Sequence, residues 1–142
     1  MSNVTSPPAA ASETAVAHFA AKLTFEADCW DVHDAMSRGD QDFVLLDVRA
    51  PDTYAAGHVP GAINLPHGKI IESRMAAWPA DTTFVVYCAG PHCNGADRAA
   101  SRLARLGRPV KLMIGGAVGW LDEGFQHVFG AEPGSLSERE AA

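Results

Sequence analysis

The fold is decided by one stretch of the chain, TFVVYCAGPHCNG at residues 83–95. Its first half is almost wholly apolar, which is typical of a strand buried on both faces of a parallel sheet. The chain then turns through Gly90 and Pro91 and enters an alanine-rich segment with the apolar spacing of a helix. A strand, a glycine-rich turn and a helix in this order predict one unit of an α/β fold. Cys88 stands at the end of the strand.

Strand and helix signals alternate on both sides of this unit. The predicted strands, besides 83–88, are an apolar run at 43–48, a short strand at 62–65, a run at 110–114 and a short extended segment at 22–25. The predicted helices start at Ser12 with an apolar face of Val16, Phe19, Ala20 and Leu23, and continue at 28–39, 69–78, 96–107 and 117–123. Such alternation indicates a mainly parallel sheet covered by helices, the α/β class.

Composition limits the classes of function. The 142 residues suffice for one domain, which we place at 12–129, between a disordered tail at 1–11 and a C-terminal tail from 130 that we expect to be frayed. The net charge of −6 argues against nucleic-acid binding, because phosphate backbones select basic surfaces. No apolar run is long enough to cross a membrane, and the first residues lack a secretory signal, so we expect a cytoplasmic location.

The three cysteines, Cys29, Cys88 and Cys93, are too few for a disulfide framework and indicate free thiols. Cys88 faces loop amides and the positive end of the following helix dipole, which both favour the thiolate. The same amides can hold an anion or the terminal sulfur of a persulfide. On position alone, Cys88 could equally be an inert buried thiol.

Three stretches together resemble the rhodanese homology domain, the thiosulfate sulfurtransferase family. They are LDVR at 46–49 with YAAGHVPGAINLP at 54–66, VVYC at 85–88 with its loop and helix, and GG at 115–116 with Trp120 and GF at 124–125. The similarity covers residues 23–128, most of the chain. The resemblance implies a parallel sheet of about five strands with helices on both faces.

The resemblance also implies an enzyme, a sulfurtransferase. In catalytic members the cysteine that matches Cys88 takes sulfane sulfur from a donor, carries it as a persulfide and passes it to an acceptor. The donor here would be thiosulfate, a small persulfide or a protein persulfide, and the acceptor a thiol or cyanide; no metal or cofactor is implied. The loop that would hold the persulfide is Ala89, Gly90, Pro91, His92, Cys93, Asn94 and Gly95. Asp47, Arg49 and His58 would support the site, Asp47 and Arg49 as an ion pair or through bonds to loop backbone.

The loop departs from the family pattern in one respect. Many single-domain members carry an arginine five positions after the cysteine, where this chain has Cys93. Its absence puts efficient use of thiosulfate, a dianion, in question, although His92 or Arg98 could supply positive charge. A related group of phosphatases carries arginine six positions after the cysteine, where Asn94 stands here. Phosphatase or arsenate-reductase chemistry is therefore the weaker alternative, because phosphoryl transfer needs that clamp.

Cys93 raises a further alternative. It could act as a resolving thiol that attacks a Cys88 persulfide or sulfenic acid and leaves a disulfide, or it could simply pack in the loop. A thiol redox protein that cycles a Cys88–Cys93 disulfide, and a non-catalytic binding module on the same fold, therefore stay open beside the sulfurtransferase. A zinc site is disfavoured, because Cys88, His92 and Cys93 lack a fourth ligand at suitable spacing.

Overall fold

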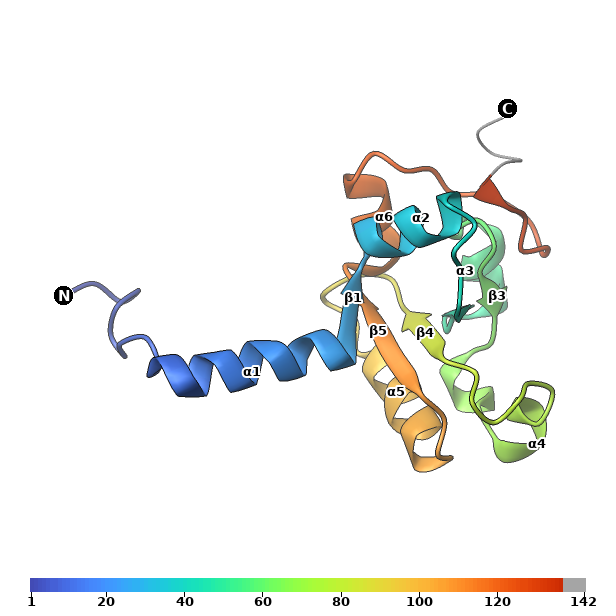
Figure 1. Ribbon diagram of the computed structural model, residues 1–142. Coiled ribbons are helices and arrows are strands. Elements are labelled where there is room, and N and C mark those ends of the chain that lie inside the picture. Colours follow the sequence, from blue (N-terminus) through green and yellow to red (C-terminus); the bar gives the residue numbers. More distant parts are fainter. Residues whose placement is uncertain (137–142) are drawn as a thin grey trace.

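A computed structural model describes residues 1–136, and the remainder of the predicted C-terminal tail lies outside the described residues. A parallel sheet of five strands forms the centre, in the order β1-β5-β4-β2-β3 (Figure 1). The strands are β1 Glu26–Asp28, β2 Val44–Asp47, β3 Ile63–Asn64, β4 Phe84–Tyr87 and β5 Val110–Ile114. The predicted α/β fold with a five-stranded parallel sheet is confirmed.

Alternation along the strands divides the core into two layers. Leu45 and Val85 are register partners and point to one face, whereas their neighbours Leu46 and Val86 point to the other. The first layer is covered by α2 Cys29–Ser37, α3 Pro51–Ala55 and α6 Gly116–Asp122. The second is covered by α4 Glu72–Met75 and α5 Gly95–Arg105, together with Ile70, which follows the 3₁₀ turn η1 His67–Lys69 (Figure 1). Both faces of the sheet are therefore buried, as the continuous apolar runs predict.

Helix α5, which follows Cys88, has two chemically distinct faces. Ala96, Ala99 and Leu103 are buried against the sheet, and arginines at 98, 102 and 105 point away from it. The small alanines allow the helix to lie close to β4 and β5. Gly107, with φ at +75°, takes the left-handed conformation that ends the helix as predicted.

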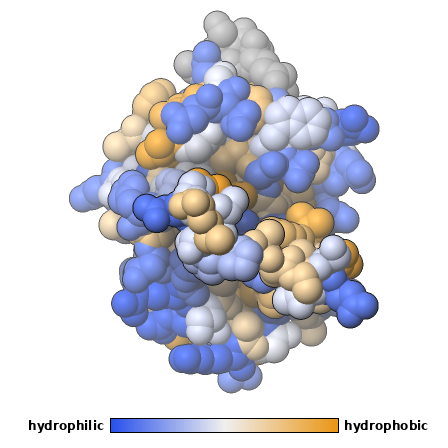
Figure 2. Space-filling view, turned by 90° about the vertical axis from the view of Figure 1, so that its left-hand side faces the viewer, coloured by the Kyte–Doolittle hydropathy of each residue, from blue (hydrophilic) through white to orange (hydrophobic). Residues whose placement is uncertain are grey.

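Helix α1, Ser12–Phe25, projects from the domain as an arm (Figure 1), and none of its residues is buried. The predicted helix is present, but its apolar face is not covered, since Val16, Phe19 and Leu23 are all exposed. Figure 2 faces the side from which α1 projects and shows apolar surface lying among hydrophilic surface. The extended segment follows this helix at 26–28. The prediction of a short strand at 22–25 is therefore wrong, because those residues form the end of α1.

Three other expectations differ from the structure. The helix predicted at 69–78 is four residues long, because Ile70 is extended and buried and separates it from η1. Helix α3 was not predicted, although Pro51 at its first position is a helix-start signal. Residues 130–136, which we expected to be frayed, contact the domain. The Pro133 carbonyl oxygen accepts from the Gly61 amide at 2.8 Å, and Leu136 packs on the core.

Candidate active site

Cys88 directly follows β4, the middle strand of the sheet, and only 7% of it is exposed. Its thiol points into the layer that packs against α5. Gly95, the first residue of that helix, leaves the space that the sulfur occupies, because a Cβ atom added at Gly95 would lie 2.8 Å from Cys88 Sγ. The sulfur therefore lies at the amino-terminal end of an eleven-residue helix, where the helix dipole favours negative charge.

The first half of the loop is held by backbone atoms of α6. The amides of Ala117 and Val118 each donate at 2.9 Å, to the carbonyl oxygens of Cys88 and Ala89. Gly116 makes this approach possible: it has φ at +62°, and a Cβ atom there would lie 2.5 Å from the Cys88 carbonyl oxygen. The loop that carries the thiol is thus fixed to α6, the helix that follows strand β5 in the chain.

Cys93 lies in the second half of the loop, half-buried, and forms a disulfide with Cys88. The two Cα atoms are 6.4 Å apart, within the usual range for bridged cysteines. The amide of Cys93 donates to the carbonyl oxygen of Gly90 at 3.1 Å, and this bond closes the loop into a tight turn. The spacing of the two cysteines does not determine whether Cys93 reaches Cys88, and the loop places it there.

A cavity of about 630 Å³ opens beside Cys88 and Cys93. Among the described residues that line it, five carry carboxylates and one, Lys22, carries an amine that lies 3.5 Å from a Glu26 carboxylate oxygen. The cavity is therefore acidic, which disfavours entry of small dianions. The five acidic residues are Glu26, Asp28, Asp97, Asp122 and Glu123.

Neither residue suggested as a substitute for the missing arginine clearly supplies a cation to this cavity. His92 is exposed, and its ring lies against Gly90. Arg98 donates to the Asn94 side-chain oxygen at 3.3 Å and lines a neighbouring hollow of about 440 Å³ with three further basic side chains, His67, Arg102 and Arg105. Positive charge gathers beside the Cys88 cavity on the outer face of α5.

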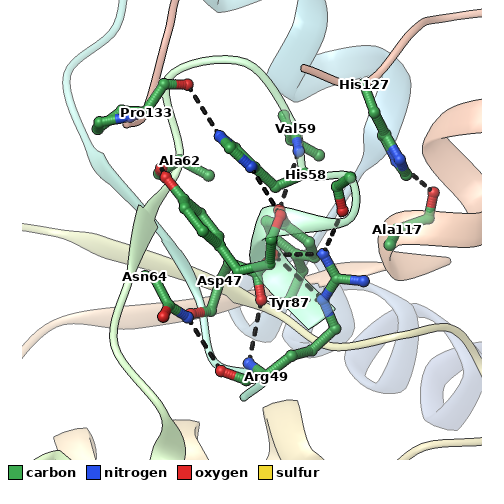
Figure 3. Close-up of polar contacts among 12 residues, drawn as sticks. Asp47, Arg49, His58, Val59, Ala62, Asn64, Tyr87, Ala117, His127 and Pro133 are labelled. Carbon is green, nitrogen blue, oxygen red and sulfur yellow. Dashed lines mark hydrogen bonds and ion pairs between the residues drawn. The ribbon is translucent and has the colours of Figure 1, made fainter. Parts of the chain in front are cut away.

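A buried ion pair lies at the end of β2, and a tyrosine of β4 bonds to its carboxylate. Arg49 Nη2 lies 2.6 Å from Asp47 Oδ2, and the same guanidinium donates to the carbonyl oxygen of Gly57 at 2.7 Å (Figure 3). The Tyr87 hydroxyl donates to Asp47 Oδ2 at 2.7 Å and accepts from the Val59 amide at 3.0 Å. An ion pair and bonds to loop backbone were the two expected roles of Arg49, and it makes both, the second to the backbone of the loop at Gly57.

His58 is fully buried in the turn that follows α3. Its ring nitrogens lie 2.9 Å from the Tyr54 carbonyl oxygen and 3.1 Å from that of Pro133, and its ring stacks on the Tyr54 ring (Figure 3). Asn64 donates to the carbonyl oxygens of Asp47 and Arg49. This polar cluster lies outside the Cys88 cavity. The structure brings Cys93 and Gly95 to the Cys88 thiol and places Gly90 and Pro91 along the cavity. Asn94 lines the neighbouring hollow, and Asp47, Arg49 and His58 lie outside the cavity lining.

Three members of this region were not singled out from the sequence. Tyr87 carries a hydroxyl within a fully buried strand, and a buried hydroxyl needs a partner, which is a signal that could have found it. Asn64 ends the short edge strand and gives no comparable signal. His127 lies 3.0 Å from the Ala117 carbonyl oxygen, and burial lowers the pKa of its ring. It therefore supports the α6 segment that anchors the loop.

Comparison with known proteins agrees with this arrangement. The model of the family described as "Rhodanese-like domain" matches residues 30–123. The chain belongs to the rhodanese-like family. Over 81 residues it is 33% identical to the thiosulfate sulfurtransferase GlpE of Pseudoalteromonas translucida, covering 56% of this chain and 74% of that one. Among solved structures, the BH2092 protein of Bacillus halodurans superposes with a TM-score of 0.81 at 33% identity, covering 85% of this chain and 88% of that one.

A third similar protein is a transcriptional regulator. The chain is 43% identical over 77 residues to an HTH-type transcriptional regulator of Mycobacterium tuberculosis. That match covers 54% of this chain and only 33% of the regulator. In the described part of the chain, no helix could span a membrane. Within residues 1–136, no group of three or more His, Cys, Asp and Glu side chains is placed to hold a metal ion.

Proposed function

We propose that this rhodanese-like protein is a sulfurtransferase that carries sulfane sulfur as a persulfide on Cys88. The observation that carries the proposal is the position of Cys88 Sγ against Gly95, at the start of α5 and beside an open cavity. In that position the helix dipole and the loop amides stabilise a thiolate and, after transfer, a charged outer sulfur. The sulfurtransferase relatives support the family-level activity.

The reaction has two steps in this proposal. The Cys88 thiolate attacks the outer sulfur of a donor, a new S–S bond forms, and the remainder of the donor leaves with the electron pair of the broken bond. An acceptor thiolate or cyanide then attacks the outer sulfur of the persulfide and returns Cys88 as a thiolate. We place this reaction in the cytoplasm, where a reducing environment keeps Cys88 as a thiol.

The acidic cavity bears on the choice of donor. Thiosulfate carries two negative charges, and the loop has Cys93 and Asn94 where related enzymes place arginine. A persulfide that reacts in its protonated form, on a small molecule or on another protein, presents an uncharged outer sulfur to the Cys88 thiolate, whereas both charges of thiosulfate lie on the group that must enter the cavity. We therefore expect a persulfide donor to load Cys88 faster than thiosulfate does.

The test is the intact mass of the reduced protein before and after exposure to thiosulfate, and separately to glutathione persulfide. A gain of one sulfur mass that cyanide removes, and that Cys88→Ser lacks, supports the proposal. Circular dichroism on the variant checks that its fold is intact. Sulfur loading that persists in Cys88→Ser contradicts the assignment of Cys88. No gain of sulfur with either donor, in wild type and in a Cys93→Ser variant alike, contradicts the sulfurtransferase and favours the non-catalytic binding module.

The Cys88–Cys93 disulfide favours a second candidate, a thiol redox protein. In that function an oxidant such as peroxide converts Cys88 to a sulfenic acid, and Cys93 displaces water to form the disulfide. Peptide mapping after mild peroxide treatment tests it. A bridged loop peptide in a protein that takes up no sulfur supports this function, and its absence contradicts it.

A further inference from the structure

The loop places the sulfur of Cys93 beside the sulfur of Cys88. Cys88 Sγ and Cys93 Sγ are bonded in the structure. A Cβ atom at Gly95 would lie 2.8 Å from Cys88 Sγ, which is too close, and 3.5 Å from Cys93 Sγ, which is an ordinary contact distance. The Cys88 sulfur therefore fills the space that this glycine leaves at the start of α5, and the Cys93 sulfur lies at the border of that space. Any sulfur species bound to Cys88 therefore has Cys93 beside it.

The two thiols differ in how they are held. Cys88 is buried, and its backbone is fixed by α6, whereas Cys93 is half-buried and faces the cavity. The third cysteine of the chain, Cys29, donates its thiol to the carbonyl oxygens of Ile114 and Gly116, and burial raises its pKa to about 12. Cys93 is therefore the one thiol of this chain placed to react with a group on Cys88.

We propose that Cys93 resolves the Cys88 persulfide and that the protein thereby releases hydrosulfide, a reductive activity beyond sulfur transfer. The proposal rests on the formation of a Cys88 persulfide. Transfer to an external acceptor and resolution by Cys93 then compete for the same intermediate.

The Cys93 thiolate attacks the inner sulfur, Cys88 Sγ, of the protonated persulfide, and the Cys88–Cys93 S–S bond forms. The bond between Cys88 Sγ and the outer sulfur breaks, and that sulfur leaves as hydrosulfide with the electron pair and its proton. The outer sulfur is reduced, and the two thiols are oxidised to a disulfide. A dithiol reductant then restores both thiols by exchange and is itself oxidised to a disulfide.

A single-turnover experiment tests this inference. Wild type, Cys93→Ser and Cys29→Ser are reduced, freed of reductant, loaded anaerobically with glutathione persulfide and desalted. Hydrosulfide and intact mass are then followed with no reductant present, so that the chain's own thiols are the only source of electrons. Cys29→Ser is the matched control, because Cys29 lines the same cavity but its thiol is buried and donates to the carbonyl oxygens of Ile114 and Gly116.

We expect wild type and Cys29→Ser to release one equivalent of hydrosulfide. Their final mass should be that of the reduced chain less two hydrogens, with the peptides of Cys88 and Cys93 linked. Cys93→Ser should keep the sulfur that it takes up and release hydrosulfide at least tenfold more slowly. Cys93→Ala provides a second variant should the serine variant misfold.

Other outcomes overturn the inference in distinguishable ways. Wild type that retains sulfur as long as Cys93→Ser shows that Cys93 does not resolve the persulfide. Sulfur found on the Cys93 peptide shows a relay in place of a reduction. If neither wild type nor Cys93→Ser gains sulfur, the proposed function itself fails, and the inference fails with it.

Discussion

Tyr87 and Asp47 face each other across the two neighbouring parallel strands β4 and β2, and the tyrosine hydroxyl donates to the aspartate at 2.7 Å. Burial raises the pKa of Tyr87 well above its usual value of 10.0, and the charge on Asp47 adds to this, so the hydroxyl remains a donor. Because Tyr87 is the residue before Cys88, this bond positions the strand end that carries the reactive thiol.

Replacing Tyr87 with phenylalanine should cost stability rather than chemistry. The change removes the hydroxyl that serves both Asp47 and the Val59 amide, and it leaves buried polar groups without a partner. We expect the free energy of unfolding to fall by about 1–3 kcal/mol. Chemical denaturation measures the loss. Sulfur uptake by the folded variant should stay within about threefold of wild type, and a much larger loss would mean that the hydroxyl acts at the thiol.

Removing the guanidinium of Arg49 should cost more. The Arg49→Met variant leaves the fully buried Asp47 carboxylate without its counter-charge, which destabilises proteins by about 3–5 kcal/mol. The double variant Asp47→Asn/Arg49→Met removes both charges and should recover a large part of that loss. Denaturation of the single and double variants forms the test. Equal stabilities for the two would show that the unpaired charge on Asp47 is not the source of the loss.

The Gly95→Ala variant should block the thiol while leaving the fold intact. Alanine is favoured in helices, but its Cβ would lie 2.8 Å from Cys88 Sγ, so the sulfur must move. We expect sulfur uptake to fall by about tenfold to a hundredfold, as for other small misplacements of reacting atoms. Gly68→Ala is the matched control, because no atom lies within 4 Å of its added Cβ. Similar uptake by both variants would contradict the positioning role of Gly95.

The acidic cavity should hinder thiosulfate. The double variant Asp122→Asn/Glu123→Gln removes two carboxylates from the lining, and we expect the loading rate with thiosulfate to rise by about twofold for each charge removed. The control Asp52→Asn/Glu72→Gln removes two charges elsewhere on the surface. The gain should shrink at high ionic strength because salt screens exposed charges. Equal gains in the two double variants would show that net charge alone matters.

Cys29 should make the fold sensitive to alkali. Burial raises its pKa from 9.0 to about 12, with further contributions from Asp28 and Glu123, so the folded state holds a proton that the unfolded state loses first. The stability that this provides is fully present below pH 9.0 and is lost as the pH rises through about 12. Wild type should lose about 1.4 kcal/mol per pH unit relative to Cys29→Ser within that window. The test is the free energy of unfolding of both proteins against pH under reducing conditions. Parallel curves for wild type and Cys29→Ser would refute this.

The sequence predicted those parts of the fold whose signals are local. The apolar runs at 43–48 and 110–114 led to the correct strands, and the spacing of Ala96, Ala99 and Leu103 led to the correct face of α5. The same kind of spacing on α1 predicted a helix but not its surroundings, because periodicity does not say what covers an apolar face. The packing of residues 130–136 depends on a backbone carbonyl, that of Pro133, which has no side-chain signature.

In the site, too, the sequence predicted what depends on local signals and not what depends on contacts between distant segments. The position of Cys88 between strand and helix follows from the local pattern, and the resemblance to rhodanese-like proteins identifies the loop. Contact between Cys88 and Cys93 depends on how a seven-residue loop folds, and spacing alone does not determine that. The acidic cavity joins residues of α1, β1, α5 and α6, which are far apart in the chain, so it could not be predicted from any one segment.

The two bonds from α6 to the loop have a consequence for how this protein can vary. Both use main-chain atoms at each end, so they depend on the path of the backbone and not on the side chains of residues 89–92. The exposed side chain of His92 can therefore be exchanged without altering these two bonds, whereas Pro91 itself restricts the path of the backbone. Substrate preference can in this way be altered independently of the geometry that holds the reactive sulfur, which makes the loop tip a natural place to engineer donor choice.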